Sequence, residues 1–91
     1  MQTTRLTDAN LVTAPDGSEI RELVATEKGS MVHCTLPPGK TSLAVAHRTA
    51  DEVWYFISGV GEVWRENDDD EIVVDAEPGL SLSIEVGTHF Q

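Results

Sequence analysis

Two histidines and one glutamate stand out in this sequence, because they occupy places where a row of apolar side chains is expected. His47 ends a row with Leu43 and Val45, Glu52 begins a row with Trp54 and Phe56, and His89 follows a row of Leu80, Leu82 and Ile84. A carboxylate on an apolar face is costly unless it is paired or binds a cation. Two imidazoles and one carboxylate form the ligand set of facial metal sites, which leave coordination positions open for substrate or dioxygen.

These three residues therefore predict a site for a divalent transition metal, and iron, manganese, nickel, copper and zinc all accept such ligands. A second interpretation of the same residues stays open. His47, Glu52 and His89 also fit a hydrogen-bonded polar cluster, since a histidine at a strand end is commonly a rim residue and Glu52 follows Asp51 at a turn.

The elements that must position these side chains are short strands separated by turns. Glycine, proline and polar clusters punctuate the chain, and between them lie segments of about 5–8 residues rich in β-branched, aromatic and other apolar residues. The strands are expected near Glu19–Ala25, Met31–Leu36, Ser42–His47, Glu52–Ser58, Gly61–Arg65, Glu71–Asp75 and Leu80–Ile84. No helical periodicity is sustained, so the sequence predicts an all-β sandwich or barrel.

Alternation along two of these segments assigns faces to their residues. In the segment that begins at Glu52, Trp54 and Phe56 share its side, whereas Val53, Tyr55 and Ile57 share the opposite side. Since both faces are apolar, this strand is expected to be central, or to meet another subunit with one face. Leu80, Leu82 and Ile84 form an inward row against Ser81 and Ser83.

Size and charge narrow the classes of partner. The 91 residues predict a single domain, residues 1–91, and 16 acidic against 6 basic residues give a net charge of −10. This balance disfavours nucleic acid and anionic membranes as partners, because binding to either requires clustered cations on the protein.

No apolar stretch is long enough to span a bilayer, and the N-terminus lacks the pattern of a signal peptide. Cys34 has no second cysteine to pair with, so a reducing compartment, the cytoplasm, is expected.

The spacing around His47 and Glu52 resembles the first motif of the cupin superfamily, which runs Gly, five residues, His-X-His, three or four residues, Glu, six residues, Gly. Here the matching positions are Gly39, Val45-Ala46-His47, Glu52 and Gly59, with valine in place of the first histidine. The second cupin motif runs Gly, five residues, Pro-X-Gly, two residues, His. It is matched by Gly79, Glu85-Val86-Gly87 and His89, with glutamate for proline and the histidine one residue early.

The resemblance implies a small β-barrel, the double-stranded β-helix or jelly roll of two antiparallel sheets, with a pocket at one mouth. Carried over position by position, the cupin metal ligands become His47, Glu52 and His89, while Val45 cannot coordinate. Val45, Trp54 and Phe56 would form the apolar wall of a pocket for a small organic molecule. Two functions follow as expectations: a metal-dependent enzyme of oxygenase or isomerase type, or a non-catalytic binding module that has lost its metal.

Cupins continue past the second-motif histidine for one or two further strands, whereas this sequence ends at Gln91. The resemblance therefore implies a barrel that is incomplete at the C-terminus, or one completed by another subunit. An open sheet edge exposes unpaired backbone groups that invite association. A homodimer, with exchange of strands between the chains, is the expected assembly.

Overall fold

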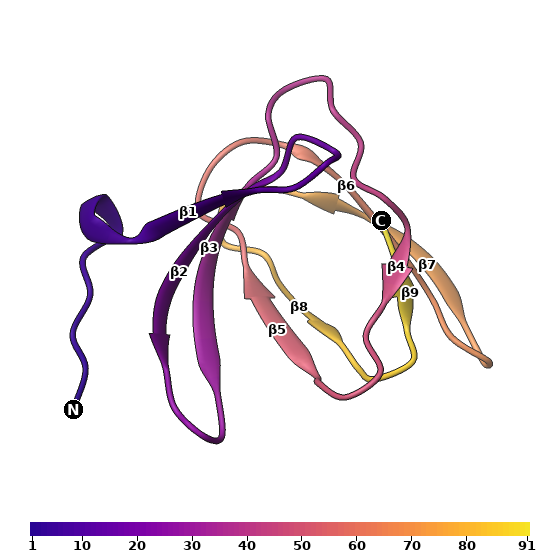
Figure 1. The fold of residues 1–91 in the computed structure, drawn as a ribbon. Coiled ribbons are helices and arrows are strands. Elements are labelled where there is room, and N and C mark those ends of the chain that lie inside the picture. Colours follow the sequence, from indigo (N-terminus) through magenta and orange to yellow (C-terminus); the bar gives the residue numbers. More distant parts are fainter. The chain divides into compact units, whose positions relative to one another are not determined.

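The computed structural model describes residues 1–91, which divide into an N-terminal unit, Met1–Ser42, and a C-terminal unit, Leu43–Gln91. Strands dominate both units, and the single helical element is a 3-10 turn, η1 (Leu6–Asp8) (Figure 1). No helix is long and apolar enough to cross a membrane. Each unit is described by itself below.

The N-terminal unit is one antiparallel sheet of three strands. Its strands are β1 (Asn10–Thr13), β2 (Glu19–Ala25) and β3 (Ser30–Thr35), in the order β1-β2-β3. The turn between β1 and β2 contains Gly17 at φ 92°, a conformation that glycine adopts without steric cost. Val12, Ile20 and Cys34 lie opposite one another in the register and give the sheet an apolar face.

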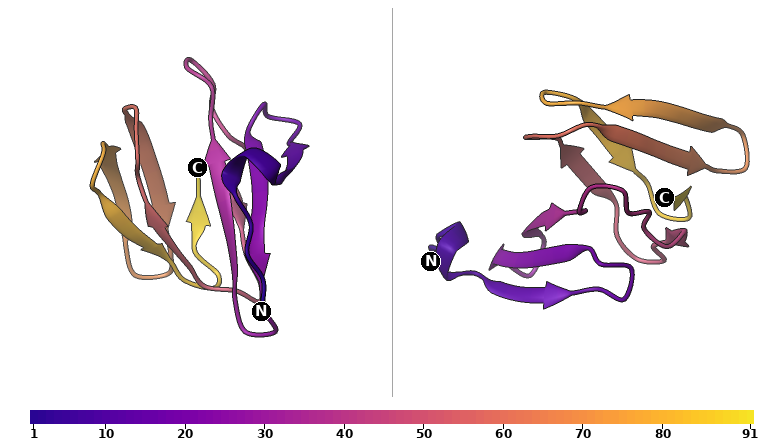
Figure 2. Two further views of the ribbon diagram at one scale, coloured as in Figure 1. Left: turned by 90° about the vertical axis from the view of Figure 1, so that its left-hand side faces the viewer. Right: turned by 90° about the horizontal axis from the view of Figure 1, so that it is seen from above.

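The C-terminal unit contains two antiparallel sheets. One has the order β4-β9-β6-β7 and the other pairs β5 with β8 (Figure 1, Figure 2). The strands are β4 (Val45–Ala46), β5 (Glu52–Tyr55), β6 (Gly61–Glu66), β7 (Glu71–Ala76), β8 (Ser81–Ile84) and β9 (His89–Phe90).

The core of this unit draws on both of its sheets. Its buried members are Val63, Ala76, Leu82, Ile84 and Phe90, and Trp54, Phe56, Val74 and Leu80 pack against them. Ile84 is 0% exposed, and burying such a side chain stabilises a fold by about 1.5–3 kcal/mol. The inward row on β8 is thus confirmed, because Leu82 and Ile84 are buried while Ser81 is exposed.

The all-β class and its antiparallel sheets are confirmed, but the sheets do not close into the expected barrel. In the C-terminal unit the four-stranded sheet ends at β4 on one side and at β7 on the other, and β5 and β8 form a separate pair. Closure requires a ladder of hydrogen bonds that returns to the first strand, and no such ladder joins these sheets.

Strand positions agree with the alternation pattern to within about two residues for β2, β3, β6, β7 and β8. The segment expected at Ser42–His47 is shorter, since only Val45–Ala46 forms a ladder, and β1 and β9 were not anticipated. The expectation that β5 is central is wrong, because its sheet has only two strands. Its outer face is exposed: Val53 is 86% exposed, and Tyr55 and Ile57 are exposed too. A second subunit on this face stays a prediction.

Candidate functional site

The structure brings His47 and Glu52 together at the start of the C-terminal unit. His47 directly follows β4, Glu52 begins β5, and the Nε2 atom of His47 lies 2.8 Å from Oε1 of Glu52. The turn before β9 holds this connection in place. The amide of Gly87 donates to the carbonyl of His47 at 2.9 Å, and the amide of Val86 donates to the carboxylate of Asp51 at 2.8 Å.

The second carboxylate oxygen of Glu52 is also occupied. The indole Nε1 of Trp54 donates to Oε2 of Glu52 at 2.7 Å. Trp54 lies two residues along the same strand, and residues so spaced share a face of a sheet. The carboxylate of Glu52 is half-buried on a strand with apolar neighbours. Its two oxygens therefore find hydrogen-bond partners within the chain, one imidazole and one indole.

An aromatic surface lies beside this polar cluster of His47, Glu52 and Trp54. The ring of Phe90 is centred 5.4 Å from the His47 ring and 5.5 Å from Trp54, which it meets edge to face. Phe56 lies 6.1 Å from Trp54, and Val45 is directly opposite Phe90 in the register of β4 and β9. Of the predicted wall residues, Trp54 and Val45 thus lie beside Phe90 and Phe56 lies beside Trp54, although Val45 is 42% exposed.

The structure does not bring His89 into this cluster. His89 precedes Phe90 on β9, and consecutive strand residues point to opposite faces of a sheet. Phe90 is buried against His47, whereas His89 is exposed and lies opposite Ala46 and Glu66 in the register. No group of three or more His, Cys, Asp or Glu side chains in the structure is arranged to hold a metal ion.

Sequence reasoning missed Arg65, a charged residue on the otherwise apolar inner face of the four-stranded sheet. It shares this face with Val63, two residues earlier, and lies opposite Phe90 and Ile72 in the register. Its Nη1 donates to the carbonyl of Ser83 at 2.9 Å, so the side chain joins the two sheets of the unit. The alternation of Val63 and Arg65 on β6 would have identified this inward cation.

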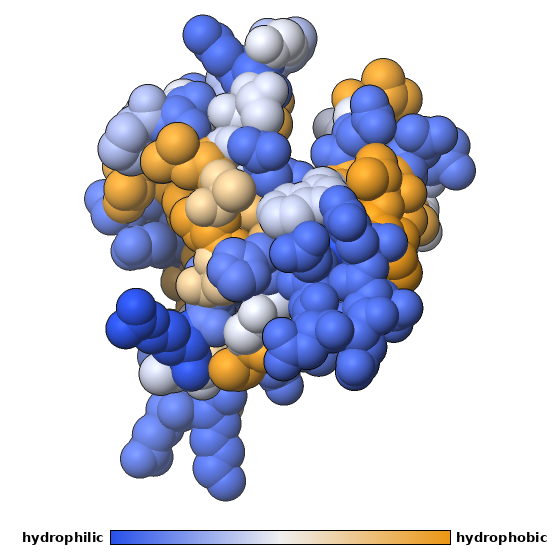
Figure 3. Space-filling view, turned by 90° about the vertical axis from the view of Figure 1, so that its right-hand side faces the viewer, coloured by the Kyte–Doolittle hydropathy of each residue, from blue (hydrophilic) through white to orange (hydrophobic).

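The outer face of the same sheet is strongly acidic. Two cross-strand pairs set like charges against each other, Glu62 opposite Asp75 and Glu66 opposite Glu71. Figure 3 views the molecule from the side of Figure 1 that carries the labels of β4, β7 and β9, and hydrophilic residues cover much of that view. His89 lies beside Glu66 on this outer face.

Neither the protein-family models, nor the curated proteins, nor the solved structures contain a match to this chain.

The chemistry that the His47–Glu52–Trp54 cluster can perform follows from its hydrogen bonds. With Nε2 directed at Glu52, the remaining ring nitrogen of His47, Nδ1, has no partner within the chain, and the side chain is 40% exposed. The imidazole can therefore present one further polar contact to a bound molecule, as a donor when it is protonated and as an acceptor when it is neutral. Both oxygens of Glu52 are committed to holding the imidazole and the indole in place.

Proposed function

We propose that the C-terminal unit is a cupin-like module that binds a small organic molecule without a metal. The observation that carries this proposal is the cross-strand pair of Val45 and Phe90, next to the intact pair of His47 and Glu52. In the cupin spacing Val45 stands at the place of the first histidine. The histidine of the second motif would fall at position 90, which is Phe90 here. Two of four ligand positions thus carry apolar side chains.

The donor set that remains does not fit a transition metal. Metal sites of this class need at least three protein donors that converge on one point. His47 and Glu52 supply two, and they are hydrogen-bonded to each other rather than directed at a common vacant point. His89, the expected third donor, lies on the outer face of the sheet. We therefore propose binding rather than metal-dependent catalysis as the function.

The lining of the site indicates the kind of molecule. Trp54 and Phe56, both half-buried, offer an aromatic surface backed by the buried ring of Phe90, and Nδ1 of His47 offers one polar contact beside it. Small-molecule sites are mostly apolar, with a few polar groups that fix orientation. A ligand with an aromatic or aliphatic body and a single polar group, such as a phenol or a benzoate, matches this lining.

Nitrogen-15 NMR of the indole N–H groups tests the proposal with phenol and benzoate as probes. Trp64→Phe identifies the Trp54 signal, which should shift saturably on addition of a probe. His47→Ala should weaken the effect at least about tenfold, since it removes the polar contact. His89→Ala is the matched control and should leave the titration unchanged.

Two outcomes would overturn the proposal. One is a Trp54 signal that neither probe moves. The other is stoichiometric uptake of iron, manganese, nickel, copper or zinc that both His47→Ala and His89→Ala abolish, because that would restore the three-ligand metal site.

A further inference from the structure

One edge of β5 has no neighbouring strand, because its sheet contains only β5 and β8. Phe56 directs both of its backbone groups to the β8 side. Its N–H donates to the carbonyl of Leu80 at 2.9 Å, and its carbonyl accepts from the adjoining turn, also at 2.9 Å. Backbone groups alternate in direction along a strand, so those of Val53, Tyr55 and Ile57 point to the other side, where they have no hydrogen-bond partner. Since these residues are 86%, 69% and 66% exposed, another strand can reach them.

The side chains along this edge carry no charge. No charged residue lies between Glu52 and Glu62, and no proline interrupts the segment. Natural proteins protect open edges with such residues. β7, the edge strand of the four-stranded sheet, follows that rule, since it carries Glu71 and Asp75. Two copies of this acidic chain would therefore repel each other at β7 but not at β5.

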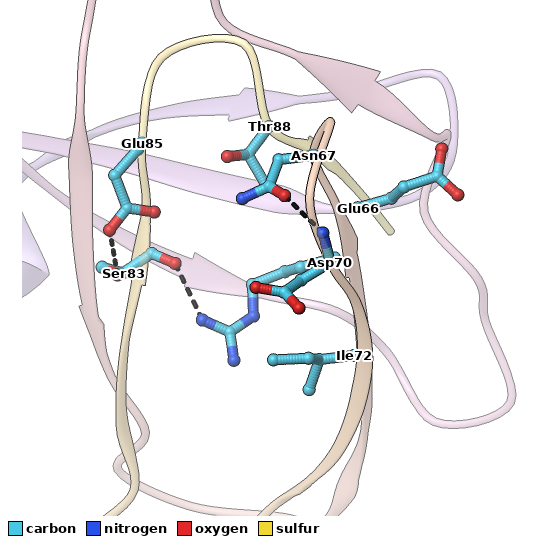
Figure 4. Close-up of a pocket in the computed structure, with 8 residues that line it drawn as sticks. Glu66, Asn67, Asp70, Ile72, Ser83, Glu85 and Thr88 are labelled. Atoms are coloured by element: carbon cyan, nitrogen blue, oxygen red, sulfur yellow. Dashed lines mark hydrogen bonds between the residues drawn. The ribbon is translucent and has the colours of Figure 1, made fainter.

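The opposite edge of the same sheet is partly covered. On β8, Ser83 lies opposite Val53, so the backbone groups of Ser83 also point away from the pair. The carbonyl of Ser83 accepts from Nη1 of Arg65 at 2.9 Å, a bond that Figure 4 shows as a dashed line. An added strand finds this acceptor occupied, whereas the outward acceptors of β5 are free.

We propose that two copies of this chain pair through β5, antiparallel and with Tyr55 on the twofold axis. Val53 then lies opposite Ile57 of the partner subunit. In this register every outward N–H and C=O of Val53, Tyr55 and Ile57 meets its complement, because outward groups oppose outward groups. A shift by one residue sets outward groups against inward ones, and a shift by two leaves one residue of each copy without a partner. The pairing uses the open edge of both copies, so it closes at a dimer.

The inner face of the joined strands carries aromatic residues of the candidate site. In the same register Trp54 lies opposite Phe56 of the partner subunit, and aromatic pairs of this kind stabilise a sheet. The partner subunit would thus extend the aromatic surface beside His47. This consequence rests on the proposed function, whereas the pairing of the strands does not.

Sedimentation velocity and amide hydrogen exchange test the inference on the unaltered chain. Dimer should appear as the protein concentration rises from about 1 μM to about 1 mM, and added sodium chloride should favour it, since both copies are acidic. In the dimer the amides of Val53, Tyr55 and Ile57 should exchange at least about tenfold more slowly. The amide of Val73, on the edge strand β7, is the control and should not change.

A lysine on the edge should break the pairing. Val53→Lys places a charge within the uncharged segment and should weaken dimerisation at least about tenfold. Val60→Lys is the matched control, because it makes the same change at a residue that is 91% exposed and lies outside β5. It should leave dimerisation equal or slightly stronger, since it lowers the net negative charge.

Disulfide cross-linking in a Cys34→Ser background tests the register. Tyr55→Cys should link two identical copies, because the Cα atoms of a hydrogen-bonded pair are about 5.5 Å apart, within the range of a disulfide. Val53→Cys should not link to itself, since the two copies of this position lie about 14 Å apart. It should link to Ile57→Cys when the two variants are mixed.

Four results would overturn the inference. They are a monomer at all these concentrations, a dimer that Val53→Lys leaves intact, a Val53→Cys variant that links to itself as readily as Tyr55→Cys, and assemblies that grow beyond two copies. A dimer with the expected register that binds neither phenol nor benzoate would support the pairing and overturn only the proposed function.

Discussion

At the scale of single residues, Glu52 is the side chain on which the polar cluster depends. It accepts from His47 through one carboxylate oxygen and from Trp54 through the other. Glu52→Gln keeps the shape but leaves one acceptor oxygen and places an amide N–H₂ against a donor. The side chain of Glu52 is 34% exposed, so hydrogen bonds to water replace part of those that the substitution removes. We therefore expect Glu52→Gln to lower the free energy of unfolding by about 1 kcal/mol. Urea denaturation measures it.

Glu62→Gln is the control for this prediction, since it makes the same chemical change on the outer face. Glu62 lies opposite Asp75, and the removal of a like-charge pair should leave stability equal or slightly higher. If Glu52→Gln and Glu62→Gln changed the free energy of unfolding by the same amount, the hydrogen bonds of Glu52 would contribute nothing to stability.

The candidate site was partly predictable from the sequence. The tight connection between His47 and Glu52 predicts correctly that the two side chains meet, because both lie at the same end of successive strands. His89 was harder to place, since a shift of one residue along a strand moves a side chain to the other face. It comes one residue early for the second cupin motif, and Phe90 takes the inner position instead. The contact between Arg65 and Ser83 spans 18 positions and two sheets, so no local pattern indicates it.

At the scale of the elements, the β5–β8 pair offers a direct test of which face is buried. Ile84 on β8 is 0% exposed, whereas Ile57, just beyond β5, is 66% exposed. Ile84→Val removes a methylene group from the core and should lower the free energy of unfolding by about 0.5–1.5 kcal/mol. Ile57→Val makes the same change on the exposed side and should stay within about 0.5 kcal/mol of the original protein. Urea denaturation of both variants gives the comparison, and a reversed order would contradict the face assignment.

Alternation predicted the longer strands well because it is a local property. The register of β6 and β7 puts Val63 opposite Val74 on the inner face and Trp64 opposite Val73 on the outer face, as the pattern of each segment indicates. β9 has only two residues and therefore no alternation to detect. Closure into a barrel depends on pairing between strands that are distant in sequence, and the pattern within each strand carries no information about it.

At the scale of the whole molecule, the charge is unevenly distributed. The net charge is −10, and all but one unit of it belongs to residues 43–91. In that C-terminal unit His47 contacts Glu52 at 2.8 Å. Carboxylates lie directly opposite each other at Glu62 and Asp75 and at Glu66 and Glu71. Repulsion within this unit therefore opposes the folded state.

Salt should consequently stabilise this protein. Between about 0.01 M and about 0.1 M sodium chloride the Debye length falls from about 30 Å to about 10 Å, which screens repulsion between exposed carboxylates. We expect the free energy of unfolding to rise by an amount of the order of 1 kcal/mol over this range. Thermal or urea unfolding measures it, with chloride rather than sulfate because sulfate also strengthens apolar burial. Glu62→Lys converts one repulsive pair into an attractive one, so its stability should be higher at low salt and should respond less to added salt. Stability that is flat or falls with salt in the original protein would show that the acidic face does not destabilise the fold.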